Sequence, residues 1–167
     1  MKSSQMAAFA AMFCAALFIA AMLARPAFAD EPIVGTWKMV SWVDEDLETK
    51  GQKAVFGQHP GGLLIFTPEK HFFILLTAEG RKGGQSEADR ARNFLSSFAV
   101  AGKYRVEGSK HFWMVEVSEY PALVGTEPTR DIMIEGNRLT FVSAPERIPW
   151  MDNHMARSTL VWERVTQ

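Results

Sequence analysis

The sequence has almost no cysteine, since Cys14 is the only one among 167 residues. No disulfide can form within the chain. Because Cys14 lies in the apolar N-terminal stretch, thiol catalysis and thiolate metal sites are excluded for the remainder. An excess of one charge is also lacking, because 18 basic and 19 acidic residues give a net charge of −1. This balance does not favour binding to nucleic acid or to an anionic membrane surface.

Sequence motifs of catalysis and metal binding are lacking as well. The chain contains no nucleophile elbow, phosphate loop, dinucleotide fingerprint or zinc motif, and no two of its histidines stand at a metal-ligand spacing. We therefore expect no metal ion and no cofactor. The acidic run Asp44-Glu45-Asp46 lacks the spacing of a calcium loop and is expected to be solvated. The histidines expected in loops or on strand surfaces are His59, His71, His111 and His154.

The N-terminal stretch predicts a signal peptide over residues 1–29. An apolar run from Met6 to Ala24 is followed by Ala27-Phe28-Ala29, a small-residue cleavage pattern. Cleavage there would leave residues 30–167 as one domain, located in the periplasm or secreted, with no stable membrane span. The apolar run is also close to the length needed to cross a bilayer, so an uncleaved membrane anchor is the alternative.

The rest of the chain is rich in short segments of strand character separated by turn residues. Strands and helices do not alternate along the sequence, so a parallel sheet is not indicated. We predict an all-β fold, an eight-stranded antiparallel up-and-down barrel in which the first and last strands are neighbours, because a closed sheet hides every strand edge. The predicted strands are Val34–Val43, Gly62–Thr67, His71–Thr77, Val100–Val106, His111–Glu119, Thr129–Glu135, Arg138–Ser143 and Ala156–Val165.

Alternation of residues predicts the two faces of each strand. In the first strand, Trp37, Met39, Ser41 and Val43 are expected on one face, and Lys38, Val40 and Trp42 on the other. Both faces of His71–Thr77 are apolar, which is typical of a strand lying under a lid or against a helix.

One amphipathic helix is predicted between residues 86 and 98. Ser86 is its expected N-cap, with Asp89 as the partner in a capping box. Its apolar face consists of Ala88, Ala91, Phe94, Leu95 and Phe98. We expect this helix to cover one end of the barrel.

An ordered set of short motifs is similar to the lipocalin-like domain family of bacterial and fungal proteins, which is related in shape to the lipocalins. The motifs are Gly35-Thr36-Trp37-x-x-Val40-Ser41-Trp42, Gly62 to Thr67, Ala101 to Val106, Val115 to Ser118, Pro121, Gly125-Thr126, Arg130, Gly136 to Thr140 and Thr159 to Arg164. The family often has histidines just before its V-E-V-S step, where this chain has Trp113 and Met114. The resemblance implies that Trp37 packs against Arg164 at the closed end of the barrel, as a structural pair.

Candidate ligand-binding residues follow from the predicted strands. Glu116 and Arg130 lie at mid-strand positions of consecutive strands, where a hairpin could bring them opposite each other inside an apolar cavity. The alternative is an ion pair on the surface. The candidate pocket aromatics, which would otherwise pack in the core, are Phe66, Tyr104, Trp113, Tyr120 and Trp150.

Three functions are compatible with such a barrel. The first is an exported carrier that binds a small hydrophobic or amphipathic ligand without catalysis, and it is favoured because few ionisable groups are expected inside. The second is a small-barrel enzyme of the isomerase, cyclase or dehydratase type that uses Glu116 and Arg130. The third is a structural envelope protein whose cavity is filled by its own side chains. The oligomeric state is left open.

Overall fold

The computed structural model describes residues 32–148 and 151–166, which form one compact unit. Eight long strands, one helix and several short elements make up this part of the chain. The long strands are β1 (Gly35–Asp46), β3 (Gly61–Phe66), β4 (His71–Thr77), β5 (Ser97–Glu107), β6 (Lys110–Ser118), β7 (Thr129–Glu135), β8 (Arg138–Ser143) and β10 (Met155–Arg164). The remaining elements are β2 (Gln52–Ala54), β9 (Glu146–Arg147), the helix α2 (Glu87–Leu95) and the 3-10 turn η1 (Pro121–Leu123).

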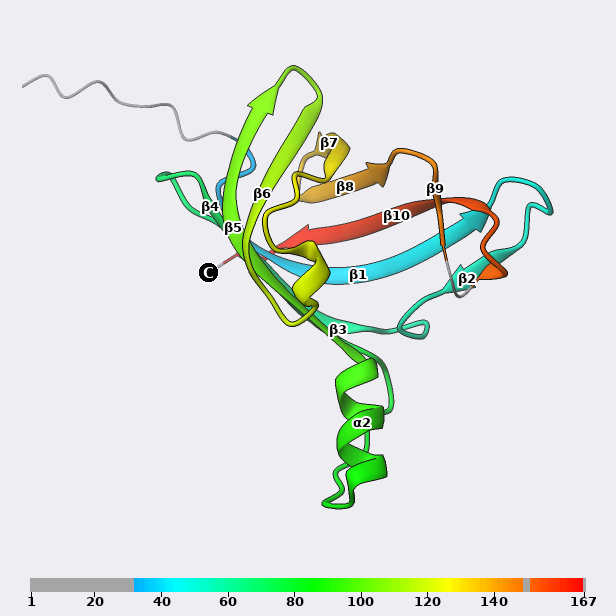
Figure 1. Cartoon of the computed structure of the whole chain (residues 1–167). Coiled ribbons are helices and arrows are strands. Elements are labelled where there is room, and N and C mark those ends of the chain that lie inside the picture. The colour runs from blue at the N-terminus through cyan, green and yellow to red at the C-terminus, as the bar shows by residue number, and fades with distance from the viewer. Residues whose placement is uncertain (1–31, 149–150, 167) are drawn as a thin grey trace, which may run out of the picture. The chain divides into compact units, whose positions relative to one another are not determined.

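The long strands close into an antiparallel barrel. Each strand pairs with its neighbour in the order β1-β3-β4-β5-β6-β7-β8-β10, and β10 pairs in turn with β1. Figure 1 shows β1 and β10 side by side. The predicted eight-stranded up-and-down barrel with adjacent first and last strands is therefore confirmed. The short strands β2 and β9, which the sequence did not reveal, extend the sheet beside β1 and β10.

Trp37 and Arg164 meet at one end of the barrel. They are direct partners across β1 and β10, and the Arg164 guanidinium lies 4.0 Å from the centre of the Trp37 ring. The indole Nε1 donates to the Ile33 carbonyl at 2.8 Å, and Arg164 Nη1 donates to the Val34 carbonyl at 2.9 Å. Gly35 has φ +133°, and a Cβ there would lie 2.8 Å from Arg164 Nη1. The glycine before the tryptophan is thus required by the close approach of the arginine.

A β-bulge in β1 changes which residues face the interior. Met39 pairs with Trp162 and Ser41 with Val161, so Val40 is an extra residue in the ladder. Before the bulge, Trp37 and Met39 point inward, as predicted. After it, the inward residues are Trp42, Asp44 and Asp46, so the predicted faces are wrong beyond Val40. One inserted residue reverses the alternation for the rest of the strand.

The interior is filled largely by apolar side chains from every long strand. Aromatic rings dominate its centre. The most deeply buried large side chains are Trp37, Trp162, Phe66, Phe141, Leu64, Ile74, Leu76, Leu139, His111 and Asp44. Two of these are polar, which is unusual for a barrel core and locates the site described below.

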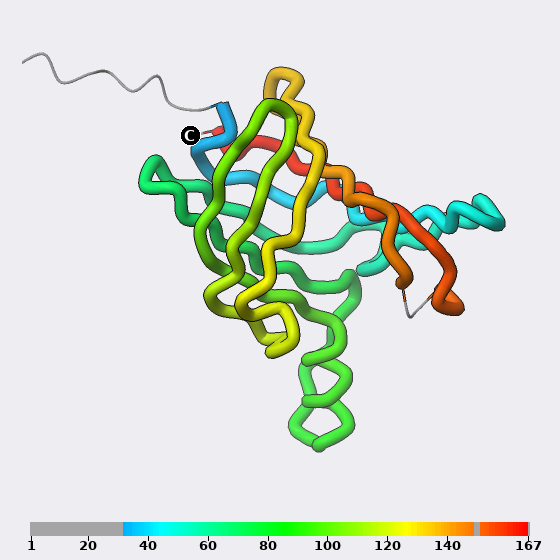
Figure 2. The backbone as a smooth tube through the Cα atoms, turned by 45° about the horizontal axis from the view of Figure 1, so that its top comes forward, coloured from blue at the N-terminus to red at the C-terminus, as the bar shows by residue number. Residues whose placement is uncertain are grey.

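Helix α2 begins where the sequence predicts but ends at Leu95, and Phe98, which was expected on its apolar face, lies in β5 and pairs with Leu76. Ser86 is the N-cap, and its side chain and that of Asp89 form the predicted capping box. However, no residue of α2 is buried, and Figures 1 and 2 show the helix pointing away from the barrel. The expected cover over the barrel end is therefore not formed by α2 in this arrangement. Its apolar residues lie exposed because only its C-terminal end contacts the barrel.

Two sequence-based expectations concern residues that the structure does not describe. The predicted signal peptide, residues 1–29, and the candidate aromatic Trp150 lie outside the described residues. Within the described part, no helix combines the length and apolar character needed to cross a membrane.

Candidate ligand-binding site

A row of polar side chains crosses the interior of the barrel from β6 to β1. His111 is the direct partner of Arg130, which in turn pairs with Ser143 on β8. Ser143 Oγ accepts from the backbone N–H of Ser158 at 2.9 Å, and Ser158 is the partner of Asp44 on β1. Direct partners on antiparallel strands share one face of the sheet. We call these five residues the polar row.

Asp44 forms the β1 end of the polar row and is fully buried. Its Oδ1 accepts from Ser158 Oγ at 2.6 Å and from the Trp42 indole N–H at 3.0 Å. These bonds offset the cost of placing a carboxylate in the barrel. The expectation that Asp44-Glu45-Asp46 is a solvated run was wrong for Asp44 and Asp46, because the bulge at Val40 turns both side chains inward.

Arg130 supplies the positive charge of the polar row. Its guanidinium is half-buried, lies 5.8 Å from the Trp113 ring, and donates from Nη1 to the Thr129 carbonyl at 3.0 Å. Burial lowers the pKa of Arg130, and the charge of Glu146 opposes this effect. Within residues 32–148 and 151–166, no carboxylate forms an ion pair with this guanidinium. The charge is thus partly desolvated without an acidic partner in contact.

The predicted pair between Glu116 and Arg130 does not form. Arg130 shares the inward face with Ile132 and Ile134, as expected, but Glu116 lies on the outer face of the barrel. The Glu116 carboxylate is instead 3.6 Å from the Lys103 ammonium, in an exposed ion pair. The alternation in β6 places His111, Trp113 and Val115 inside, which leaves the position of Glu116 outside.

Three of the predicted pocket aromatics gather around His111. Tyr104 stacks on the imidazole with ring centres 5.4 Å apart, and Phe66 meets it edge-on at 5.5 Å. The Trp113 indole N–H donates to His111 Nδ1 at 3.4 Å. Tyr104 is further fixed by a bond from its hydroxyl to the Thr67 carbonyl at 3.1 Å. His111 was expected in a loop or on a strand surface, but it is fully buried.

Tyr120 belongs to a second aromatic group near the base of α2. Its ring stacks on Phe98 at 6.0 Å and contacts Phe94 at 5.8 Å. Phe98 in turn contacts Trp42 at 5.9 Å, and Trp42 contacts Phe56 at 5.3 Å. We call these five residues the α2-end cluster. Burial, followed by the charge of Glu119, raises the pKa of the Tyr120 hydroxyl.

Trp42 joins the two groups, because it packs in the α2-end cluster and donates to Asp44 of the polar row. Trp42, Phe98 and Tyr120 are only partly buried. The arrangement therefore offers aromatic surface near one end of the barrel and hydrogen-bonding groups beside it. Small-molecule sites combine apolar surface and a few polar groups in this way.

A histidine and an aspartate tie together the loops beside β1 and β10. His154 Nδ1 lies 2.7 Å from Asp46 Oδ2, and Asp46 Oδ1 accepts from the backbone N–H groups of Glu48 and Thr49. The Thr49 backbone bond, followed by the bond with His154, lowers the pKa of Asp46 well below its ordinary value. The bond with Asp46 raises the pKa of His154. Among the described residues, no three histidine, cysteine or acidic side chains gather as a potential metal site.

The sequence indicated some members of this site and missed others. It identified Arg130 and four of the aromatic residues, namely Phe66, Tyr104, Trp113 and Tyr120. It did not point to the other aromatic residues of the α2-end cluster. It also missed Asp44, His111, Ser143 and Ser158, whose inward position is evident only once the cross-strand register is known. A polar residue at an inward position on each of several adjacent strands is the signal that would reveal such a row.

Comparison with known proteins agrees with the fold and with the motifs at both ends of the barrel. No curated protein matches this chain. Residues 34–165, from the strand that carries Trp37 to the end of β10, match the lipocalin-like domain. This match covers nearly the whole described barrel, and the chain therefore belongs to the lipocalin-like domain family.

Proposed function

We propose that this protein is an exported carrier of a small, largely apolar molecule that bears one acidic group. The observation that carries the proposal is Arg130, a half-buried guanidinium with no carboxylate in contact among the described residues. A desolvated charge is costly unless a counter-charge accompanies it. The acidic group of a ligand would supply that counter-charge, and the hydroxyl of the neighbouring Ser143 could donate a further hydrogen bond.

The apolar body of the ligand would lie among aromatic side chains. Trp113 is within 5.8 Å of the Arg130 guanidinium and could pack against the part of the ligand next to the acid. The partly buried side chains of Trp42, Phe98 and Tyr120 would provide the route of entry at the α2 end. In this proposal Phe66 and Tyr104 line the deeper part of the site. The predicted ligand contact of Glu116 is not part of it, because this side chain lies outside.

Binding of a matched acid and alcohol tests the proposal. Decanoate and decanol share an apolar chain and differ in charge, so isothermal titration calorimetry of both isolates the contribution of Arg130. We expect the wild type to prefer decanoate by about ten- to a hundredfold, because a hydrogen bond to a charged group contributes about 1.5–3 kcal/mol. Arg130→Met, which keeps an apolar stem, should abolish this preference without unfolding the barrel.

Lys103→Met is the matched control, because it removes a basic side chain that lies on the outer surface and pairs with Glu116. It should bind decanoate as the wild type does. Equal affinities of the wild-type protein for decanoate and decanol would contradict the proposal, as would an unchanged preference in Arg130→Met. Circular dichroism of each variant would establish that the barrel is intact.

A structural protein with a filled barrel is the second candidate, and one observation favours it. The central side chains Phe66, Trp113 and Phe141 are at most 5% exposed, so the barrel's own rings occupy its middle. Failure of both probes to bind would support this function. An enzyme that uses Glu116 and Arg130 together loses its basis, because the two side chains lie on opposite faces of the sheet.

The proposed export rests on the N-terminal sequence pattern and has its own test. If residues 1–29 are a cleaved signal peptide, the protein recovered from outside the cytoplasm should begin at Asp30. Mass spectrometry of the intact protein would measure this. A membrane-bound product of full length would show that the segment is an anchor.

A further inference from the structure

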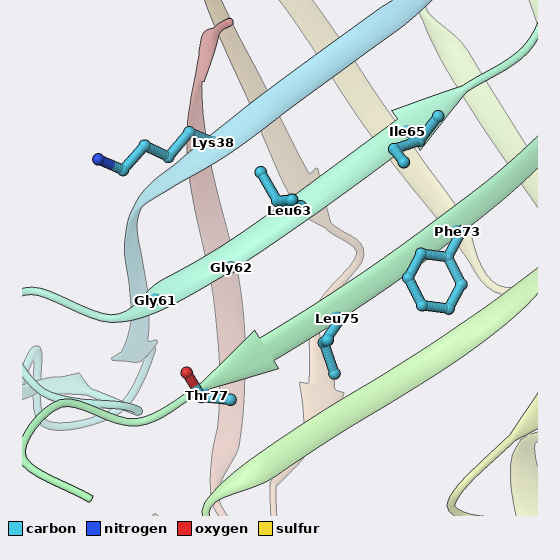
Figure 3. Close-up of a pocket in the computed structure, with 8 residues that line it drawn as sticks. All are labelled: Lys38, Gly61, Gly62, Leu63, Ile65, Phe73, Leu75 and Thr77. Atoms are coloured by element: carbon cyan, nitrogen blue, oxygen red, sulfur yellow. The ribbon is translucent and has the colours of Figure 1, made fainter.

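The outer wall of β3 and β4 carries an exposed apolar hollow. Figure 3 shows Leu63, Phe73 and Leu75 on this wall, with Lys38, Gly61 and Gly62 at the edge of the hollow. The hollow measures about 400 Å³. Leu63, Phe73 and Leu75 are 45%, 43% and 43% exposed. We call this surface, together with Ile65, the apolar wall.

The apolar wall is unusual for the outer face of a strand. Successive residues of β4 alternate between the core and the outside, yet both sets are apolar, which is typical of a strand covered on two sides. Contiguous exposed patches of this kind on soluble proteins mark interaction sites. The described residues contain no element that covers this face of β4.

Helix α2 is a second apolar surface without a cover. Its residues Phe94 and Leu95 are 48% and 69% exposed, and none of its nine residues is buried. An isolated helix of this length is not stable in water, even with good capping, because too few hydrogen bonds offset the cost of nucleation. The helix therefore needs another surface against its apolar face.

We propose that α2 of one copy packs on the apolar wall of a second copy, and the reverse, in a two-fold symmetric dimer. Leu95 of one chain would fill the glycine-floored hollow of the other. The chain itself carries both halves of this contact, a projecting apolar helix and a hollow that receives a side chain, so two copies satisfy each other with no third component.

The helix cannot reach its own wall in the position it holds. Only Ser96 separates Leu95 from Ser97, which is paired with Thr77 at the end of β4. Arg81 Nη2 donates to the Asn93 carbonyl at 3.1 Å, and the Phe94 ring contacts Tyr120 at 5.8 Å. These contacts hold α2 pointing away from the barrel (Figures 1 and 2), where a second molecule can approach it.

The exposed apolar area approaches that of a dimer interface. A fully exposed aromatic side chain offers about 150–250 Å², so the measured exposures of the wall and of α2 amount to on the order of 400 Å² of apolar surface per copy. A standard interface buries about 800 Å² per partner, of which about 65% is apolar in homodimers. The smaller side chains around the wall can supply the difference.

The distribution of charge is also compatible with a contact between identical molecules. The centre of the apolar wall carries no charged residue, and Lys38 lies beside the hollow. Helix α2 carries charges of both signs, because Glu87 and Asp89 in its first turn are followed by Arg90 and Arg92, and Asp89 pairs with Arg92. These four charges cancel, so the contact does not bury an excess of like charge.

Sedimentation equilibrium of the purified protein over a wide concentration range tests the dimer. We expect a monomer–dimer equilibrium in the wild type, and a dissociation constant at least tenfold higher for Leu75→Lys on the wall and for Leu95→Lys on α2. Both side chains are exposed, so neither change should affect the barrel. Met133→Lys, at an equally exposed apolar position on β7, is the control and should dimerise normally. A wild-type protein that stays monomeric at about 100 μM, well above the micromolar range of weak specific interfaces, would refute the proposal.

Disulfide trapping identifies the surfaces in contact. In a Cys14→Ser background, protein with Leu95→Cys is mixed with protein carrying Leu63→Cys, and oxidation should yield a disulfide-linked pair of unlike chains. A single chain carrying both cysteines should form the link between molecules. A link within one monomer would overturn the proposal in favour of α2 folding onto its own wall. Co-sedimentation of monomer with anionic lipid vesicles, lost in Leu75→Lys, would overturn it in favour of a lipid surface.

Discussion

Replacing Trp37 by alanine tests the closure of the barrel most directly. Trp37 is fully buried at the junction of β1 and β10, where its indole donates to the Ile33 carbonyl and lies under the Arg164 guanidinium. The change removes the largest side chain at this junction together with both polar contacts.

The expected loss of stability is the cost of truncating a buried aromatic side chain, which includes two polar contributions. Truncation of a buried aromatic side chain to alanine costs about 3–5 kcal/mol. Within that loss, the cation–π contact with Arg164 accounts for about 0.5–2 kcal/mol and the hydrogen bond to Ile33 for about 0.5–1.5 kcal/mol. A domain of this size is stable by about 5–15 kcal/mol. Trp37→Ala should therefore remain folded with a much lower free energy of unfolding, or unfold outright.

Urea denaturation followed by far-ultraviolet circular dichroism measures this loss. Fluorescence is unsuitable, because the chain has five tryptophans. Arg164→Met, which keeps the apolar stem, should lose about 1–3 kcal/mol, and the double variant should lose less than the sum of the two single changes. A loss below about 1 kcal/mol for Trp37→Ala, the scale of an ordinary surface change, would refute the proposed role of this junction.

Two further predictions concern other parts of the barrel. Gly102→Ala should destabilise the protein by about 3 kcal/mol in the same urea assay, because the new Cβ would lie 2.0 Å from the Met114 carbonyl oxygen. Gly83→Ala is the control and should be nearly neutral, because no atom lies within 4 Å of its new Cβ. Similar effects of both changes would contradict this reasoning. His154→Gln should lower the melting temperature in a pH-dependent way. Because Asp46 raises the pKa of His154 above its ordinary value of 6.5, the folded state holds this proton more tightly, so the stabilisation is complete below that pH and disappears as the pH rises through the raised pKa. The pKa of Asp46 is lowered from 3.8, so its contribution is present above that pH and persists until the pH falls through the lowered pKa. The difference in melting temperature between wild type and His154→Gln should therefore be largest between about pH 4 and pH 6, and it should shrink as the pH rises through the raised pKa of His154. A difference that grows with pH over this range would contradict the ion pair.

Much of the fold could be read from the sequence, because the strands are long and bounded by turn residues. The capping box of α2 and the glycine before Trp37 are local features, and both are where the sequence placed them. The short strands β2 and β9 were missed because two or three polar residues carry no periodic signal. The position of α2 could not be predicted, since an apolar helix face shows that something must cover it but not what does.

The inward-facing residues of the site were harder to predict, because a bulge interrupts the alternation of inward and outward residues along a strand. The extra residue at Val40 turned Asp44 into the barrel, although its sequence neighbours suggest a solvated acidic run. A second irregularity, between Ala101 and Gly102, occurs opposite the part of β6 that contains Glu116. Both depend on pairing with a distant strand, which the local sequence does not contain. Arg130 was placed correctly because β7 and β8 pair without a bulge.

The closure of the sheet by β10 has a consequence for how the chain reaches its native state. Arg164 bonds to a carbonyl 130 positions earlier, so the final ladder forms only when the last strand is available. Contacts between such distant segments form slowly, since a long loop must close first. Until then β1 and β8 both present bare edges that other chains can extend. A polypeptide that stops short of residue 155 should therefore aggregate, even though it contains seven of the eight barrel strands.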